Sequence, residues 1–97
     1  MMINNPNYLF PQAENTACYT SKHIIEDGKP ILHVVHDEDG EWQFMGDQEC
    51  DVEDARIVTM GQIVQLDPSV NGLYEMPSGI GAFRESVGGE WKPYKLQ

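Results

Sequence analysis

The chain has 97 residues, and its 16 acidic and six basic side chains give a formal net charge of −10 at pH 7. This length fits a single small domain, and a hydrophobic content of 40% predicts a folded rather than a disordered chain. The negative charge argues against binding to nucleic acid or to an anionic membrane, because like charges repel.

The N-terminal segment and the cysteines indicate a compartment. Residues 1–12 contain neither the basic start nor the apolar run of a signal peptide. No apolar stretch approaches the roughly 20 residues that span a bilayer. With Cys18 and Cys50 as its only cysteines, the chain carries fewer than a small secreted domain usually does. We therefore expect a soluble protein of the reducing cytoplasm.

Residues 1–16 are expected to form an N-terminal tail, and residues 17–97 a single domain. Asn, Pro and Gln dominate the tail, which lacks a periodic apolar pattern. Its apolar side chains Tyr8, Leu9 and Phe10 are nevertheless able to dock on the domain.

The first elements of the domain are short. Residues 17–20 predict a strand. Residues 21–26 are too few to classify by period, and we favour a helical turn. Asp27-Gly28 ends this turn, because glycine adopts positive φ at little cost.

A β-hairpin with an acidic turn is predicted next. Residues 31–36 are rich in β-branched side chains and predict a strand, and Asp39-Gly40 is a strong hairpin signal. The following strand alternates, with Trp42 and Phe44 on one face. We expect these two aromatic side chains to anchor the core.

The two histidines of this hairpin are not predicted to form a metal site together. On a strand, residues three apart point to opposite faces, so His33 and His36 cannot bind one ion together. With a turn of even length, His33 would lie beside the aromatic core and His36 would face solvent. We interpret each as a core or edge histidine.

A loop, a strand and a helix are predicted in the middle of the chain. Residues 46–54 are polar and acidic, and residues 55–59 predict a buried strand. Thr59 and Gln62 have the spacing of a capping box at the start of a helix. Pro68 ends the helix, because the residue before a proline is pushed away from helical angles.

The last third of the chain predicts a second hairpin. Asp67 is placed to cap a single turn over residues 68–71. Residues 80–87 and 90–94 flank a Gly-Gly pair and predict two strands. The sum is an α+β domain, with a small, mostly antiparallel sheet built from two hairpins plus one or two short helices.

No catalytic or metal-binding pattern stands out. Counted from the first aspartate of the acidic turn, Gly40 falls at position 4 and Gln48 at position 12, whereas an EF-hand needs Gly at 6 and Glu at 12. Neither Cys18 nor Cys50 has the local signature of a nucleophile with a histidine base. Residues 77–81 lack the lysine of a P-loop. We expect a non-enzymatic protein without a metal ion or cofactor.

Two acidic segments form the candidate contact surface. Residues 37–41 hold four carboxylates and residues 47–54 hold five. If both segments lie on one edge, they form a shared negative patch that steers a basic partner, raising the association rate more than the affinity. Otherwise they are a solvated turn and a solvated loop. The candidate partner-binding residues are Asp37, Glu38, Asp39, Glu41, Asp47, Glu49, Asp51, Glu53 and Asp54.

Several short motifs resemble a bacterial family. They are Gly28-Lys29-Pro30, Glu41-Trp42-Gln43-Phe44 followed by Gly46-Asp47, Ile57-Val58-Thr59, Leu66-Asp67-Pro68-Ser69-Val70, Pro77-Ser78-Gly79 and Ala82-Phe83-Arg84. Over about residues 18–94 the chain resembles immunity protein family 33 of polymorphic toxin systems, formerly a domain of unknown function. The resemblance implies an α+β fold and the neutralisation of a cognate toxin, and it carries over no catalytic residue.

Two functional hypotheses follow. In the first, an acidic face binds a protein partner, a basic toxin domain. In the alternative, the chain is a small cytoplasmic regulatory or housekeeping binding module, and its acidity serves only solubility. Exposed strand edges allow either a monomer or a homodimer.

Overall fold

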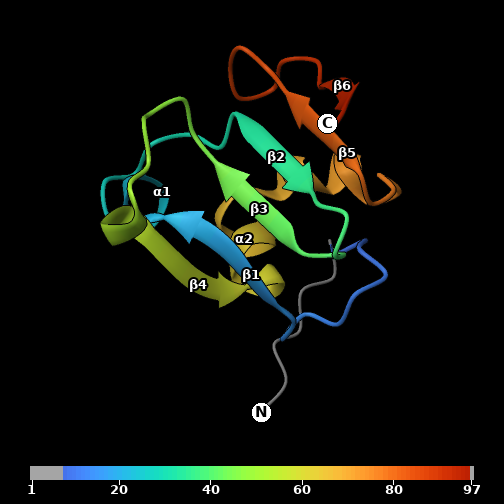
Figure 1. Cartoon of the computed structure of the whole chain (residues 1–97), viewed down its shortest axis with the longest axis horizontal. Helices are drawn as coiled ribbons and strands as arrows, with labels where there is room; N and C mark the ends of the chain where they lie inside the picture. The colour runs from blue at the N-terminus through green and yellow to red at the C-terminus, as the bar shows by residue number, and fades with distance from the viewer. Residues whose placement is uncertain (1–7, 97) are drawn as a thin grey trace.

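The computed structural model describes residues 8–96, which form a six-stranded sheet with helical segments beside it (Figure 1). The strands are β1 Ala17–Ser21, β2 His33–His36, β3 Trp42–Met45, β4 Ala55–Thr59, β5 Ile80–Phe83 and β6 Lys92–Lys95. The helical segments are α1 Lys22–Ile25, α2 Met60–Leu66 and the 3-10 helices η1 Val52–Asp54 and η2 Pro68–Leu73. The predicted α+β class is confirmed.

The sheet is mixed rather than mostly antiparallel, which corrects that part of the prediction. The strand order is β4-β1-β3-β2-β5-β6. Strands β1 and β3 are parallel, with Tyr19 beside Gln43, and the other neighbouring strands are antiparallel. The first predicted hairpin is present as β2–β3. Strands β5 and β6 form the second, but β5 ends at Phe83 and β6 begins at Lys92, so residues 84–91 form a longer loop than the predicted turn at the Gly-Gly pair. Pairing between β2 and β5 joins the two hairpins into one sheet.

Helix α2 begins and ends where the sequence predicts. The Thr59 hydroxyl accepts the N–H of Gln62 at 3.1 Å, and the Gln62 side-chain oxygen accepts the N–H of Thr59 at 2.9 Å. This reciprocal pair is the capping box. After α2, the Asp67 carboxylate accepts the N–H of Ser69 at 3.1 Å and starts η2. Both predicted caps are therefore confirmed.

The core lies between the sheet and a layer made by α2, η2 and the N-terminal segment (Figure 1). Trp42 and Phe44 are almost fully buried, as predicted. Phe10 packs edge-on against Trp42, with their ring centroids 5.0 Å apart. Residues 8–16 of the predicted tail thus dock on the domain, and residues 1–7 lie outside the described residues.

The predicted faces of the two hairpin histidines are wrong, because the turn between β2 and β3 has an odd length. Gly40 donates its N–H to the Asp37 carbonyl oxygen at 3.0 Å and has a φ of +87°. This is a type I turn closed by a glycine bulge, which places one more residue in the loop than an even turn has. His36 therefore pairs with Trp42 and stacks on its ring, whereas His33 lies on the opposite face.

Candidate functional site

One face of the sheet is not covered by any helix within residues 8–96 (Figure 1). Side chains that pair across neighbouring strands share a face, so the register identifies those on this side. We term it the open face, and it includes the side chains of Tyr19, His33, Val35, Gln43, Met45, Ile57, Phe83, Lys92 and Tyr94.

The open face exposes large apolar side chains. Ile57 is 68% exposed, Phe83 44% and Tyr19 37%. Ile57 lies directly opposite Tyr19, on neighbouring strands. The apolar pair of Ile57 and Tyr19 therefore makes this face a candidate contact surface. The sequence pattern had pointed to the acidic segments and not to this face, because the pairing of β1 with β3 and β4 is not visible locally.

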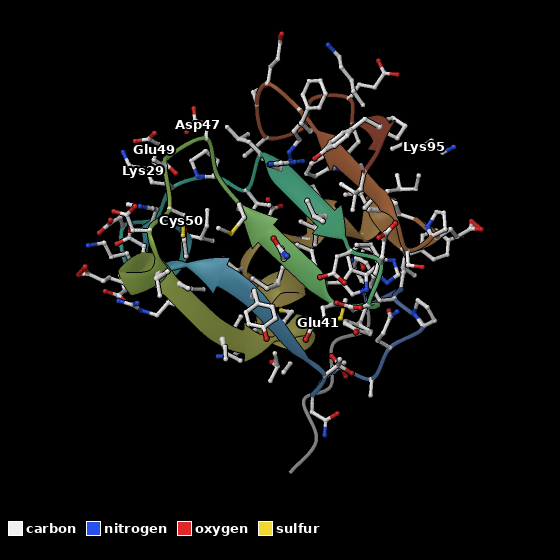
Figure 2. The ribbon with its side chains drawn as sticks, in the orientation of Figure 1. Lys29, Glu41, Asp47, Glu49, Cys50 and Lys95 are labelled. Atoms are coloured by element: carbon white, nitrogen blue, oxygen red, sulfur yellow. The ribbon has the colours of Figure 1, made fainter. Side chains whose placement is uncertain are left out.

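The two acidic segments do not form one shared patch. The first is the turn that precedes β3, and the second follows β3. Figure 2 shows Glu41 at one end of this strand, with Asp47 and Glu49 beyond its other end. The six residue-to-residue steps of extended chain from Glu41 to Asp47 span about 20 Å. The segments therefore border the open face at two separate ends.

In the first acidic segment, one carboxylate builds the turn and the others face solvent. Asp37 accepts the backbone N–H groups of Asp39 at 3.0 Å and Glu41 at 2.9 Å. The Glu41 carboxylate lies 3.5 Å from the Tyr19 hydroxyl, at the border of the open face. Glu38 and Asp39 are exposed and make no ion pair with another described residue. Within the first acidic segment, these two carboxylates are the most available to a partner.

In the second acidic segment, Asp54 has a structural role. Its carboxylate accepts the N–H of Asp51 at 3.1 Å and lies 3.5 Å from the Lys22 ammonium group. The backbone hydrogen bond from Asp51, with the nearby Lys22 and His23, lowers the pKa of Asp54. Asp47, Glu49, Asp51 and Glu53 are exposed and make no ion pair with another described residue. Within residues 8–96, this segment therefore leaves four of its five carboxylates without an ion pair.

A cleft of about 630 Å³ opens where the open face meets the second acidic segment. Its lining residues are Leu32, His33, Gly46, Asp47, Phe83, Arg84, Glu85 and Tyr94. The Nε2 atom of His33 is hydrogen-bonded to the Tyr94 hydroxyl. Burial lowers the pKa of His33 and raises that of Tyr94, so both groups are neutral at pH 7. The two residues are 61 positions apart, so sequence patterns could not bring them together.

Arg84 lines the cleft, but its guanidinium group makes its hydrogen bonds and ion pair with other residues of the protein. It is 3% exposed, donates to the Ile31 carbonyl oxygen, and pairs with Asp67 at 2.8 Å. It also donates to the Ser69 hydroxyl at 2.7 Å, and the Trp91 ring lies over its guanidinium. The Asp-Pro-Ser and Ala-Phe-Arg motifs of the resemblance therefore meet in a structural ion pair.

Neither cysteine is hydrogen-bonded to a histidine among the described residues. Cys18 is buried, and burial raises the pKa of its thiol to about 12, so it stays protonated at pH 7. Cys50 is exposed, and its thiol contacts the Asp51 carbonyl oxygen. No three His, Cys, Asp or Glu side chains in residues 8–96 are grouped to hold a metal ion.

Comparison with protein-family models, curated proteins and solved structures finds no match for this chain. Within the described part of the chain, no helix is both long and apolar enough to cross a membrane. The resemblance to an immunity family therefore rests on the short motifs alone.

Proposed function

We propose that this chain is a non-enzymatic cytoplasmic binding protein of the immunity type, which neutralises a basic toxin domain. The observation that carries the proposal is the open face, an uncovered apolar surface bordered at both ends by carboxylates. Protein interfaces commonly have an apolar centre and a polar rim. The resemblance to an immunity family supplies the class of partner.

The charge of the molecule favours a basic partner over a second copy of the same chain. Three of the six basic side chains are in ion pairs, Lys22 with Asp54, Arg56 with Glu26 and Arg84 with Asp67. These pairs leave the net charge of −10 unchanged. Two copies would repel each other, whereas a cationic domain is attracted from a distance.

Charge neutralisation tests this proposal. The toxin domain encoded beside the gene should bind the chain at low ionic strength, and the association rate should fall as salt is added. Neutralising Glu38→Gln together with Asp39→Asn should slow association several-fold and change the dissociation rate little. Gln65→Lys, an exposed change on α2 at the covered side, moves the net charge in the same direction and should have a much smaller effect. The absence of any complex at low salt would refute the proposal.

The alternative is a small regulatory or housekeeping module, and the cleft of about 630 Å³ is the observation that favours it. This volume falls within the range of about 300–1,000 Å³ that small-molecule sites occupy. The same charge variants distinguish the two functions, because only toxin neutralisation predicts that a cell carrying them loses protection against the toxin.

A further inference from the structure

We propose that the cleft beside β2, β5 and β6 receives an arginine side chain of the basic partner. This inference rests on the proposed function, since it names the group on the partner that the open face recognises. The cleft brings together aromatic rings from two strands and carboxylates from two loops, an arrangement suited to a planar cation.

The aromatic walls supply surfaces for stacking. The rings of Phe83 and Tyr94 have centroids 6.2 Å apart, and the His33 ring lies 5.7 Å from that of Tyr94. The hydrogen bond between His33 and Tyr94 holds these two rings in place. A guanidinium group stacks on such rings through its flat, weakly hydrated face, and an ammonium group lacks that face. The walls therefore favour arginine over lysine.

The charges of the lining also favour a cation. Asp47 follows β3 and Glu85 follows β5, and both line the cleft. The charge of Arg84 is balanced by Asp67, and Lys92, which pairs with Phe83, is exposed and does not line the cleft. Burial lowers the pKa of His33, so its ring adds no positive charge at pH 7. A carboxylate next to aromatic walls can accept two N–H groups from one guanidinium.

The position of the cleft fits a side chain of a docked protein. It shares His33, Phe83 and Tyr94 with the open face, so a partner lying on this face passes directly over its mouth. Asp47 belongs to the second acidic segment, which steers a cationic partner toward the same end of the sheet. One arginine at the edge of the partner's contact surface would thus enter the cleft.

Titration with amino-acid amides, followed by NMR of the isotope-labelled chain, tests this inference. N-acetyl-arginine amide should bind and shift the signals of Phe83 and Tyr94. N-acetyl-citrulline amide, which has the same shape without the charge, should bind at least fivefold more weakly, as should N-acetyl-lysine amide. The variant with Asp47→Asn and Glu85→Gln should also lose at least fivefold in affinity for the arginine probe. Glu38→Gln with Asp39→Asn, an equal change of charge at the far end of β3, should leave that affinity unchanged.

Several outcomes would overturn the inference. If the citrulline or lysine probe binds as tightly as the arginine probe, the cleft does not recognise a guanidinium group. If the two charge variants lose equal affinity for the arginine probe, the attraction is only the general one between opposite charges. A chain that binds the toxin domain but shows no arginine shifts in the cleft would refute this inference and leave the proposed function standing. A chain that binds the arginine probe in the cleft but forms no complex with the toxin would do the reverse.

Discussion

Arg84 places a positive charge in the interior, and its only ion-pair partner within residues 8–96 is Asp67. A buried charge that loses its partner destabilises a protein by about 3–5 kcal/mol, because the remaining charge stays out of water. An exposed pair contributes about 0–1 kcal/mol. Loss of the buried Arg84–Asp67 pair should therefore destabilise the protein much more than loss of the exposed Arg56–Glu26 pair.

We predict that Asp67→Asn lowers the free energy of unfolding by about 3 kcal/mol. The change keeps the size of the side chain and removes its charge. Glu26→Gln, which breaks the exposed pair with Arg56, should cost less than about 1 kcal/mol. Urea unfolding of both variants measures the difference, and equal losses would contradict the structural role given to Arg84.

His33 predicts a dependence of stability on pH. Burial lowers its pKa in the folded chain, so the folded state binds the proton less tightly than the unfolded state does. Its contribution to stability is therefore complete above about pH 6.5, the ordinary histidine pKa, and falls as the pH drops toward the lowered value. NMR titration should give the His33 ring a pKa below 6.5. Between pH 7 and 5, the free energy of unfolding of His33→Gln should fall less than that of the wild type. A ring that titrates above 6.5 would show that burial does not dominate.

At the scale of elements, local sequence patterns predicted the turns and helix caps that depend on neighbouring residues. The Asp-Gly signal found the first hairpin, and Thr59 with Gln62 found the start of α2. The turn length was wrong, because Asp37 holds the loop in a wider form through its own carboxylate. That single extra residue exchanged the faces of His33 and His36, since side chains alternate along a strand.

Contacts between distant segments could not be predicted in this way. The parallel pairing of β1 with β3, the open face that results and the hydrogen bond between His33 and Tyr94 all join residues far apart in sequence. The nine carboxylates lie before and after residues 42–45 of a predicted strand, so the length of that strand already separates them. Composition alone predicted the sign of the surface charge and not its arrangement.

The turn itself offers a prediction at this scale. Asp37→Ala removes the acceptor of two backbone N–H groups, so we expect a loss of about 1–2 kcal/mol in the free energy of unfolding. Glu38→Ala, next to it and exposed, should change stability by less than about 0.5 kcal/mol. Urea unfolding distinguishes the two, and a small effect of Asp37→Ala would mean that backbone hydrogen bonds alone define the turn.

At the scale of the whole molecule, the net charge and one edge of the sheet act against pairing between copies of the chain. Strand β6 lies at one edge of the sheet and contains Pro93, which has no N–H to offer, flanked by Lys92 and Lys95. Proline and lysine at an edge discourage pairing between copies of a chain. Together with the net charge of −10, they agree with the proposal that the open face binds a partner of opposite charge rather than a second copy.

One pair of variants tests directly whether the open face is the contact surface. Ile57 lies on the open face and is 68% exposed, whereas Leu66 lies on α2, on the covered side of the sheet, and is 53% exposed. Binding of the toxin domain encoded beside the gene is measured by calorimetry for Ile57→Asp and Leu66→Asp, two changes that add the same charge. We predict at least a tenfold loss of affinity for Ile57→Asp and little change for Leu66→Asp. Equal affinities for the two variants would contradict the assignment of the open face.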